Sequence, residues 1–320
     1  TIEQAQRVAR SYIRKVLEPQ TIHVVMRDGT YYLDTPLVFS NDDFGQPEQF
    51  EWHTMTEGVH PVVYEAHDGE SPVISGGRRI DGFRETTVNG VNAWVADVSG
   101  ARNGSWIFTE LWVNGERRFR PVLPKKGEYL IEKLLDASWE GTWSDTVGKG
   151  TKRFGYAAGD IDPDWKNFKD VEILILSLWR SLTAKLDHVD ADDRIAYMDR
   201  DSKMRLSYDF QQTGAAYNVV NVFEALDSPG EWYLDKSDGL LYYIPKPGES
   251  IDSVEVVAPY LQRIMSITGG KLGRDKRTKQ LNTRPILEFK NITFSHVEWQ
   301  APQDLATIGQ SAPMVLGAIA

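Results

Sequence analysis

The sequence predicts an all-β protein that begins with one helix and carries an inserted domain of antiparallel strands. Three short apolar runs between residues 22 and 39 are separated by Asp28-Gly29 and by Pro36, which indicates short strands joined by tight bends. Two aromatic runs within residues 231–245 flank Asp235-Lys-Ser-Asp-Gly239, whose Asp and Gly residues are typical of a hairpin turn. The rhythm of residues 22–39 suits one coil of a parallel β-helix. Because no exact repeat is evident, a β-sandwich is the alternative on pattern alone.

An amphipathic helix is predicted over residues 2–17, and Pro19 ends it. The apolar positions follow i, i+3 and i+4 spacing and are Ile2, Ala5, Val8, Ala9, Tyr12, Ile13, Val16 and Leu17. We expect the helix to cover the first coil through Val8, Tyr12 and Val16, because an uncovered coil would expose unpaired backbone groups.

The middle of the chain is predicted to be an insertion of antiparallel strands. Asn114-Gly115 is a strong signal for a hairpin turn, and the apolar run at 171–179 indicates a buried strand. The predicted division is therefore 1–81 for the helix and the first coils, 82–259 for the insertion, and 260–320 for resumed coils.

The composition limits the partners and the compartment. A formal net charge of −10 argues against a nucleic-acid partner, because binding phosphates requires clustered Lys and Arg. No window approaches eighteen continuous apolar residues, so no membrane-spanning helix is predicted. The chain contains no cysteine, which excludes disulfides, thiolate metal sites and cysteine nucleophiles. Ten Trp and thirteen Tyr suit an extracellular sugar-binding protein, although aromatic side chains also fill the cores of β proteins.

Five segments resemble large bacterial right-handed parallel β-helix proteins, notably the family 141 glycoside hydrolases and, more distantly, the family 120 xylosidases. They follow that family's order and are Arg27–Phe39, Pro61–Gly77, Glu110–Pro121, Asn218–Pro245 and Leu287–Trp299. The resemblance implies a right-handed solenoid at both ends of the chain, a helix that caps it, and an exported carbohydrate-active enzyme. It covers most of the chain, but residues 125–170 contain no matching segment.

The resemblance also implies where the chemistry lies. Glycosidases usually need two carboxyl groups that face each other across the sugar. In the resembling enzymes this acidic pair lies on later coils, so we expect it, with the remainder of the β-helix, C-terminal to Ala320. Thr1 is not a natural start, so we expect that a signal peptide was removed or that the N-terminus was trimmed. Ala312–Ala320 stops without a cap, which favours a cut from a longer chain over a natural fragment. The expected substrate is a plant-type polysaccharide containing xylose or fucose, and the expected location is periplasmic or secreted.

Within the chain, the best local cluster is Ser295-His-Val-Glu-Trp299. Strand alternation would place His296 and Glu298 together on the face opposite to Trp299. Glu298 is then a candidate catalytic carboxylate, His296 would border a sugar cleft, and Trp299 would stack on a sugar ring. The alternative is an ordinary solenoid strand with one polar face and one packed face.

Other candidates lie in predicted loops and turns. Trp52 and His53 follow the first coil, where they would either close over a groove or belong to a solvated loop. Arg117 or Arg118 would either bind a uronate carboxylate in a bidentate manner or form structural ion pairs. The run Asp187–Asp193 is rich in the carboxylates that suit Ca²⁺, but it lacks the glycine and the spacing of an EF-hand. The sequence therefore predicts no metal or cofactor, with calcium at this run as the less favoured alternative.

Three function classes fit these observations. The first is the N-terminal portion of a glycoside hydrolase that uses acid/base chemistry on a polysaccharide. The second is a β-helix polysaccharide lyase, and the third is a non-catalytic carbohydrate-binding or scaffold module. The fold alone does not separate them, because solenoids host all three. The acidic charge balance disfavours the lyase, whose substrates are polyanions.

Overall fold

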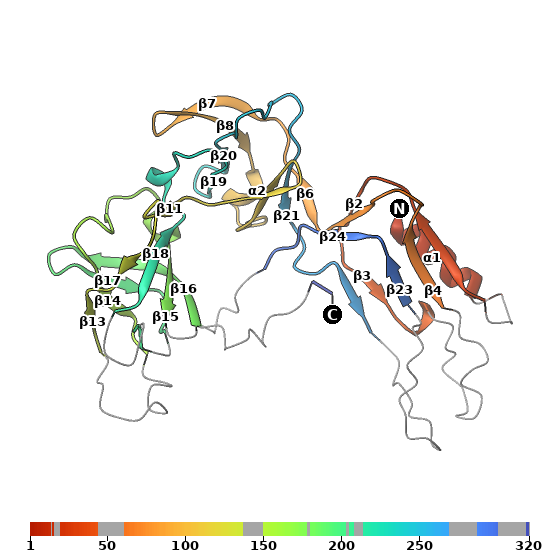
Figure 1. The fold of residues 1–320 in the computed structure, drawn as a ribbon, viewed down its shortest axis with the longest axis horizontal. Coiled ribbons are helices and arrows are strands. Elements are labelled where there is room, and N and C mark those ends of the chain that lie inside the picture. The colour runs from red at the N-terminus through yellow and green to blue at the C-terminus, as the bar shows by residue number, and fades with distance from the viewer. Residues whose placement is uncertain are drawn as a thin grey trace, which may run out of the picture. The chain divides into compact units, whose positions relative to one another are not determined.

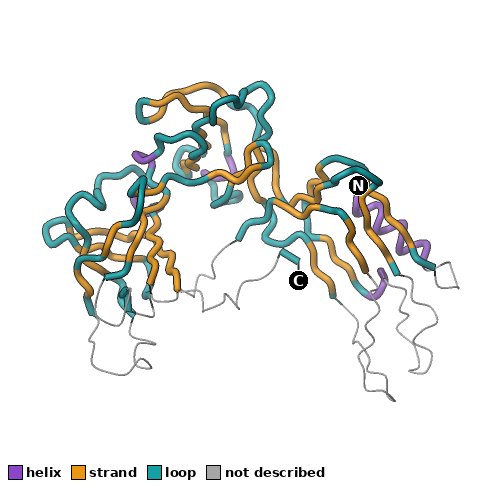
Figure 2. Tube along the Cα trace, in the orientation of Figure 1, coloured by secondary structure: helices purple, strands orange, loops and turns teal. Residues whose placement is uncertain are grey.

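A computed structural model describes residues 1–13, 15, 20–43, 61–136, 150–177, 180–202, 205–207, 214–268, 287–299 and 318–319. Strands dominate these residues, and the few helices are short (Figure 2). The chain forms two compact units. One comprises Thr1–Arg78 and Val257–Glu298 with Leu316–Ala320, and the other comprises Arg79–Val256 with Trp299. The predicted three-part division at residues 81 and 259 stays a prediction.

The first unit is built from three parallel sheets, whose strands appear in Figure 1. Sheet β1-β4-β23 contains β1 (Ile22–Met26), β4 (Val62–Ala66) and β23 (Leu287–Lys290). Sheet β2-β5-β24 contains β2 (Thr30–Tyr32), β5 (Val73–Ser75) and β24 (Thr293–Ser295). The third sheet pairs β3 (Leu37–Phe39) with β22 (Met265–Ile267). A short 3-10 helix, Asn41–Asp43, follows β3.

The strands of these three sheets pair in the order in which they occur along the chain, and we call each run of consecutive strands a round. The first round runs β1, β2, β3, and the second places β4 on β1 and β5 on β2. After β5 the chain leaves the first unit, and β22 then pairs with β3. A third round places β23 on β4 and β24 on β5. The second round is therefore interrupted between β5 and β22, which is where the sequence predicts an insertion.

Aromatic side chains stack from one round to the next inside the first unit. Tyr64 of β4 and Phe289 of β23 are register partners, and their rings are stacked 5.4 Å apart. Phe39 of β3 meets both rings edge-on, at 5.5 and 5.8 Å. Phe39 and Tyr64 are almost fully buried. Such contacts between neighbouring strands stabilise a sheet stack beyond the burial of area alone.

Helix α1 (Ile2–Ile13) packs on the first unit through a different stripe from the one predicted. Its buried residues are Ile2, Gln6, Ala9 and Ile13. Val8 and Tyr12 are 57% and 45% exposed, so the prediction that they cover the coil is wrong. Instead they border a groove of about 620 Å³ between α1 and β1. Val16, the third predicted contact, lies outside the described residues.

Polar anchors explain why this stripe of α1 faces inward. The side-chain amide of Gln6 donates to the Val38 carbonyl at 2.8 Å. Arg10 binds Asp43 in a bidentate pair, with Nε–Oδ1 and Nη2–Oδ2 distances of 2.8 Å. The helix carries apolar residues on two adjacent stripes, and these contacts with β3 and the turn after it fix its rotation.

The second unit is antiparallel throughout its two main sheets. An eight-stranded sheet has the order β11-β18-β15-β16-β17-β14-β13, with β12 also paired to β18. Its strands are β11 (Val122–Leu123), β12 (Tyr129–Leu130), β13 (Lys133–Leu134), β14 (Arg153–Gly155), β15 (Glu172–Ser177), β16 (Arg180–Asp190), β17 (Ile195–Met198) and β18 (Ala216–Val220). A four-stranded sheet has the order β19-β20-β8-β7 and contains β7 (Arg84–Val88), β8 (Val91–Asp97), β19 (Trp232–Asp235) and β20 (Leu240–Tyr243).

A further four-stranded sheet has the order β10-β9-β21-β6. It contains the hairpin of β9 (Leu111–Val113) and β10 (Glu116–Arg118) together with β6 (Gly77–Arg79) and β21 (Val256–Pro259). The short helices are α2 (Ser99–Arg102) and the 3-10 turns Phe168–Asp170 and Phe223–Ala225.

The turn residues in the sequence correctly predicted the positions of two hairpins in the second unit. Asn114 and Gly115 adopt φ values of 52° and 76° between β9 and β10, as a two-residue hairpin turn requires. Gly239 takes φ 67° between β19 and β20. The strand predicted at 171–179 is β15, described as Glu172–Ser177, and its side chains alternate between buried and less buried positions. The antiparallel character predicted for the insertion is confirmed.

Candidate functional site

The predicted cluster at 295–299 is a chain corner rather than a continuous strand. Strand β24 ends at Ser295, and His296 takes φ 60°, in the left-handed region that few non-glycine residues occupy. The His296 ring lies on Ser75, with Nδ1 2.9 Å from the serine Oγ. The N–H of Gly77 donates to the same Oγ at 3.1 Å. Ser75 is fully buried, so its hydroxyl holds the two rounds together at this corner.

Two glycines make this corner possible. A Cβ on Gly76 would lie 2.9 Å from Cγ1 of Val297, and a Cβ on Gly77 would lie 2.8 Å from the Cβ of His296. Neither distance leaves room for a side chain. Ser75 was not among the predicted site residues, but the Gly76-Gly77 pair after it signals a close approach of backbone.

Glu298 lies inside the protein. It is 5% exposed, and its backbone N–H donates to the Leu261 carbonyl at 2.9 Å. The prediction that His296 and Glu298 share one face of a strand is wrong, because the left-handed turn at His296 ends the alternation. Trp299 is 38% exposed. Trp52 and His53 lie outside the described residues, and a role in sugar binding for any of these residues stays a prediction.

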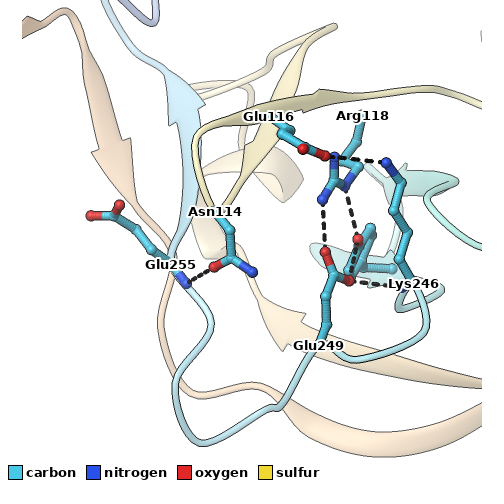
Figure 3. A network of polar contacts seen from close by, with 7 residues as sticks. Asn114, Glu116, Arg118, Lys246, Glu249 and Glu255 are labelled. Atoms are coloured by element: carbon cyan, nitrogen blue, oxygen red, sulfur yellow. Dashed lines mark hydrogen bonds and ion pairs between the residues drawn. The ribbon is translucent and has the colours of Figure 1, made fainter.

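Arg118 lies at the centre of a buried polar network in the second unit (Figure 3). Its Nε donates to the Tyr243 hydroxyl at 3.0 Å, and its terminal nitrogens bind Glu116 and Glu249, both at 2.7 Å. The Tyr243 hydroxyl in turn donates to Glu249 Oε2 at 2.6 Å. Lys246 adds a backbone N–H to the same oxygen, and its ammonium lies 3.3 Å from Glu116.

In this network the Arg118 guanidinium is bound by side chains of the protein itself. Burial alone would lower the pKa of Arg118, but its bonds to Tyr243, Glu116 and Glu249 raise it. Burial, and next the bond to Glu249, raise the pKa of the Tyr243 hydroxyl. The geometry matches the structural ion pairs that the sequence offered as the alternative for Arg118, and it leaves the guanidinium enclosed. The network links β10 to a loop far away in sequence.

Asp235, at the end of β19, organises the turn of the β19–β20 hairpin. Its Oδ1 accepts the N–H groups of Ser237 and Asp238 at 3.0 and 3.2 Å, and its Oδ2 lies 2.5 Å from Lys166 Nζ. Burial by itself would raise the pKa of Asp235, but the ion pair with Lys166 and these hydrogen bonds lower it to about 2. Asp235 is therefore a buried, ionised structural residue.

The acidic run Asp187–Asp193 forms part of β16 and the turn that follows it. Asp187 pairs with Lys169 at 3.1 Å and with His188 at 2.9 Å. Asp190 accepts the N–H of Asp193 at 3.1 Å. Across the residues that the structure describes, no group of three or more His, Asp or Glu side chains converges closely enough to hold a metal ion.

In the part of the chain that the structure describes, no helix has both the length and the apolar character needed to cross a bilayer.

Comparison with known proteins gives two kinds of match. Residues 91–246 match the model of the GH141 insertion domain. The structure resembles a solved protein titled "Glycoside hydrolase", with a TM-score of 0.70 and 23% identity, over 95% of this chain and 48% of that one. At this identity the likeness concerns the fold, and the chain spans about half the length of that protein.

Two other comparisons add no support for a family or a function. A structure titled "The complex structure of XylC with xylose" aligns with 90% of this chain and 32% of its own, but its 9% identity and TM-score of 0.28 support no argument. No curated protein matches the sequence. The family match and the fold together make this chain similar to GH141 glycoside hydrolases, with residues 91–246 corresponding to their insertion domain.

Proposed function

We propose that this chain is the N-terminal portion of an exported glycoside hydrolase that acts on a plant-type polysaccharide containing xylose or fucose. The observation that carries the proposal is the match of residues 91–246 to the GH141 insertion domain, set between strands that begin and resume a parallel stack. The likeness of fold to a solved glycoside hydrolase supports it.

The three parallel sheets are, in this proposal, the first rounds of a right-handed parallel β-helix. Strands of successive rounds pair in parallel and in register, as in β1-β4-β23 and β2-β5-β24. Neighbouring strands lie about 4.8 Å apart, so a solenoid offers rigid positions for carboxylates on adjacent rounds. Hydrolysis needs two such groups, about 5–5.5 Å apart for retention or about 6.5–9.5 Å apart for inversion.

We place that carboxylate pair C-terminal to Ala320. Glu298, the local candidate, is buried at a corner, and Ser75 with its glycine neighbours fills the space beside that corner. A catalytic carboxylate has to reach a glycosidic oxygen or a sugar carbon directly. The first rounds would then supply the frame of the enzyme, while later rounds would supply its acid and its base or nucleophile.

The experiment that tests the proposal uses the complete protein as its gene encodes it. We expect the complete protein to hydrolyse at least one member of a panel of aryl xylosides, aryl fucosides and plant polysaccharides. NMR analysis of the first product then shows whether configuration is retained or inverted. Unsaturated uronate products, which absorb in the ultraviolet, would identify a lyase instead and contradict the proposal. A gene that stops directly after Ala320, with no turnover, would favour a binding module.

A further inference from the structure

The outer face of the β9–β10 hairpin carries an aromatic and charged strip. Its inward side chains are Leu111, Val113 and Arg118, all buried. Arg117 pairs with Trp112 in the register of the hairpin, so their side chains share the opposite face. Alternation along the two strands adds Glu110 beside Trp112 and Phe119 beside Arg117 to this face. We call Glu110, Trp112, Arg117 and Phe119 the outer strip.

Phe119 is held rigidly while its ring stays in solvent. The side chain is 66% exposed, the largest exposed fraction among the big apolar side chains in the part of the chain described. Its backbone is fixed on both sides, because its N–H donates to Gly230 at 3.3 Å and its carbonyl accepts the N–H of Trp232 at 3.0 Å. A large aromatic ring presented on fixed backbone suits binding better than a ring on a mobile loop, because less freedom is lost when a ligand binds.

The charges of the outer strip neutralise each other. Arg117 forms an ion pair with Glu110, and its guanidinium carbon lies 5.9 Å from the centre of the Trp112 ring. The Glu110 side chain is only 14% exposed, whereas that of Arg117 is 58% exposed. The strip therefore offers aromatic surface and the N–H groups of the half-exposed Arg117 without a net charge. An anionic ligand would have to compete with Glu110 for Arg117.

These properties fit the two-sided chemistry of a sugar ring. A pyranose has an apolar face of C–H groups, which packs on the electron-rich face of an aromatic ring, and a rim of hydroxyls that hydrogen-bond to polar side chains. Trp112 and Phe119 are diagonal neighbours across the hairpin, and such positions lie about 7–8 Å apart. We propose that the outer strip is a binding site for a neutral oligosaccharide of the polysaccharide substrate. The identity of that polymer rests on the proposed function, but the site itself rests on the hairpin.

The test is calorimetric titration of the 320-residue chain with xylotetraose and with xyloglucan oligosaccharides, and with oligogalacturonate as the acidic comparison. We expect a neutral ligand to bind, and Phe119→Ala to weaken its association constant about tenfold, which corresponds to about 1.4 kcal/mol. Phe119→Tyr should retain binding, because it keeps the ring. Leu130→Ala is the matched control, since Leu130 is 60% exposed on β12. It should bind like the wild type. Thermal melting of each variant confirms that it is folded.

Several results would overturn the inference. The first is equal affinity of the wild type and Phe119→Ala for the neutral ligand, and the second is an equal loss of affinity in Leu130→Ala. The third is tighter binding of oligogalacturonate than of either neutral ligand, and the fourth is that neither neutral ligand binds. Turnover by the complete protein is a separate measurement. If the complete protein cleaves its substrate but Phe119→Ala binds normally, only this inference fails. If Phe119→Ala loses binding but the complete protein shows no turnover, only the proposed function fails.

Discussion

Two adjacent arginines on β10 differ completely in their surroundings. The Arg118 side chain is 2% exposed and bound to Glu249, itself 9% exposed, whereas the Arg117 side chain is 58% exposed. Removing one member of a buried ion pair leaves the other charge buried without an opposite charge, which lowers stability strongly. An exposed ion pair contributes little to the free energy of unfolding. The sequence Glu116-Arg-Arg118 does not reveal this difference by itself, because Glu249 and Tyr243 reach Arg118 from more than a hundred residues away.

We therefore expect Arg118→Ala to lower the free energy of unfolding by about 3–5 kcal/mol, because it strands the Glu249 carboxylate in the interior. Arg117→Ala is the matched control and should change this free energy by about 0–1 kcal/mol. Urea unfolding followed by tryptophan fluorescence measures both. Equal effects of the two substitutions would show that the network does not stabilise the domain.

Asp235 gives a pH-dependent prediction. Its pKa falls from about 3.9 in an unfolded chain to about 2 in the folded protein, so folding favours the ionised form. The stability it contributes is present above about pH 4 and disappears as the pH falls toward 2. The difference in unfolding free energy between the wild type and Asp235→Asn should therefore shrink between about pH 6 and about pH 3.

Asp238→Asn, in the same turn, serves as the control for Asp235. Its side chain is 55% exposed and lies 3.4 Å from Lys166. Asp238→Asn should lower the unfolding free energy much less than Asp235→Asn, because an exposed ion pair contributes little. If the cost of Asp235→Asn stays constant across this range, folding does not lower the pKa of Asp235.

At the scale of elements, local sequence signals predicted the hairpins. The buried face of helix α1 and the corner at His296 depend on tertiary contacts and were not predicted. Turn formers between residues 235 and 239 and at Asn114-Gly115 specify their backbone angles directly, so the sequence located both turns. The sequence also located helix α1, but it did not show which side of the helix is buried. The helix has two apolar stripes, and contacts with residues far away in sequence determine which one faces the core. The corner at His296 escaped prediction because alternation assumes an unbroken strand.

The helix supplies a direct test of this correction. Ile13→Ala should lower the unfolding free energy by about 2–5 kcal/mol, because Ile13 is buried against the first unit's core. Tyr12→Ala should cost less, since the Tyr12 ring is 45% exposed and its hydroxyl bonds only Gln20 among the contacts described. Thermal unfolding of the two variants compares them. A larger loss of unfolding free energy from Tyr12→Ala would show that the helix packs through the face that the sequence predicted.

At the scale of the whole molecule, resemblance carried more of the functional argument than physical pattern did. Strand periodicity left a β-sandwich open, whereas the order of Arg27–Phe39, Pro61–Gly77 and Leu287–Trp299 pointed to a stack interrupted by an insertion. These segments contain β2, β5 and β24, which form one parallel sheet. The catalytic carboxylates could not be predicted, because 46 acidic residues give no pattern that marks a pair across a sugar.

The central claim is that these 320 residues build the frame of a glycoside hydrolase while its carboxylate pair lies C-terminal to them. The most direct measurement is the hydrolysis rate of the purified 320-residue chain on aryl xylosides and aryl fucosides, beside its Glu298→Gln variant and the complete protein. We expect the 320-residue chain to hydrolyse neither substrate above the uncatalysed rate, with or without the substitution, while the complete protein turns over. Clear turnover by the 320-residue chain that Glu298→Gln abolishes would contradict the claim and place the active site at the β24 corner.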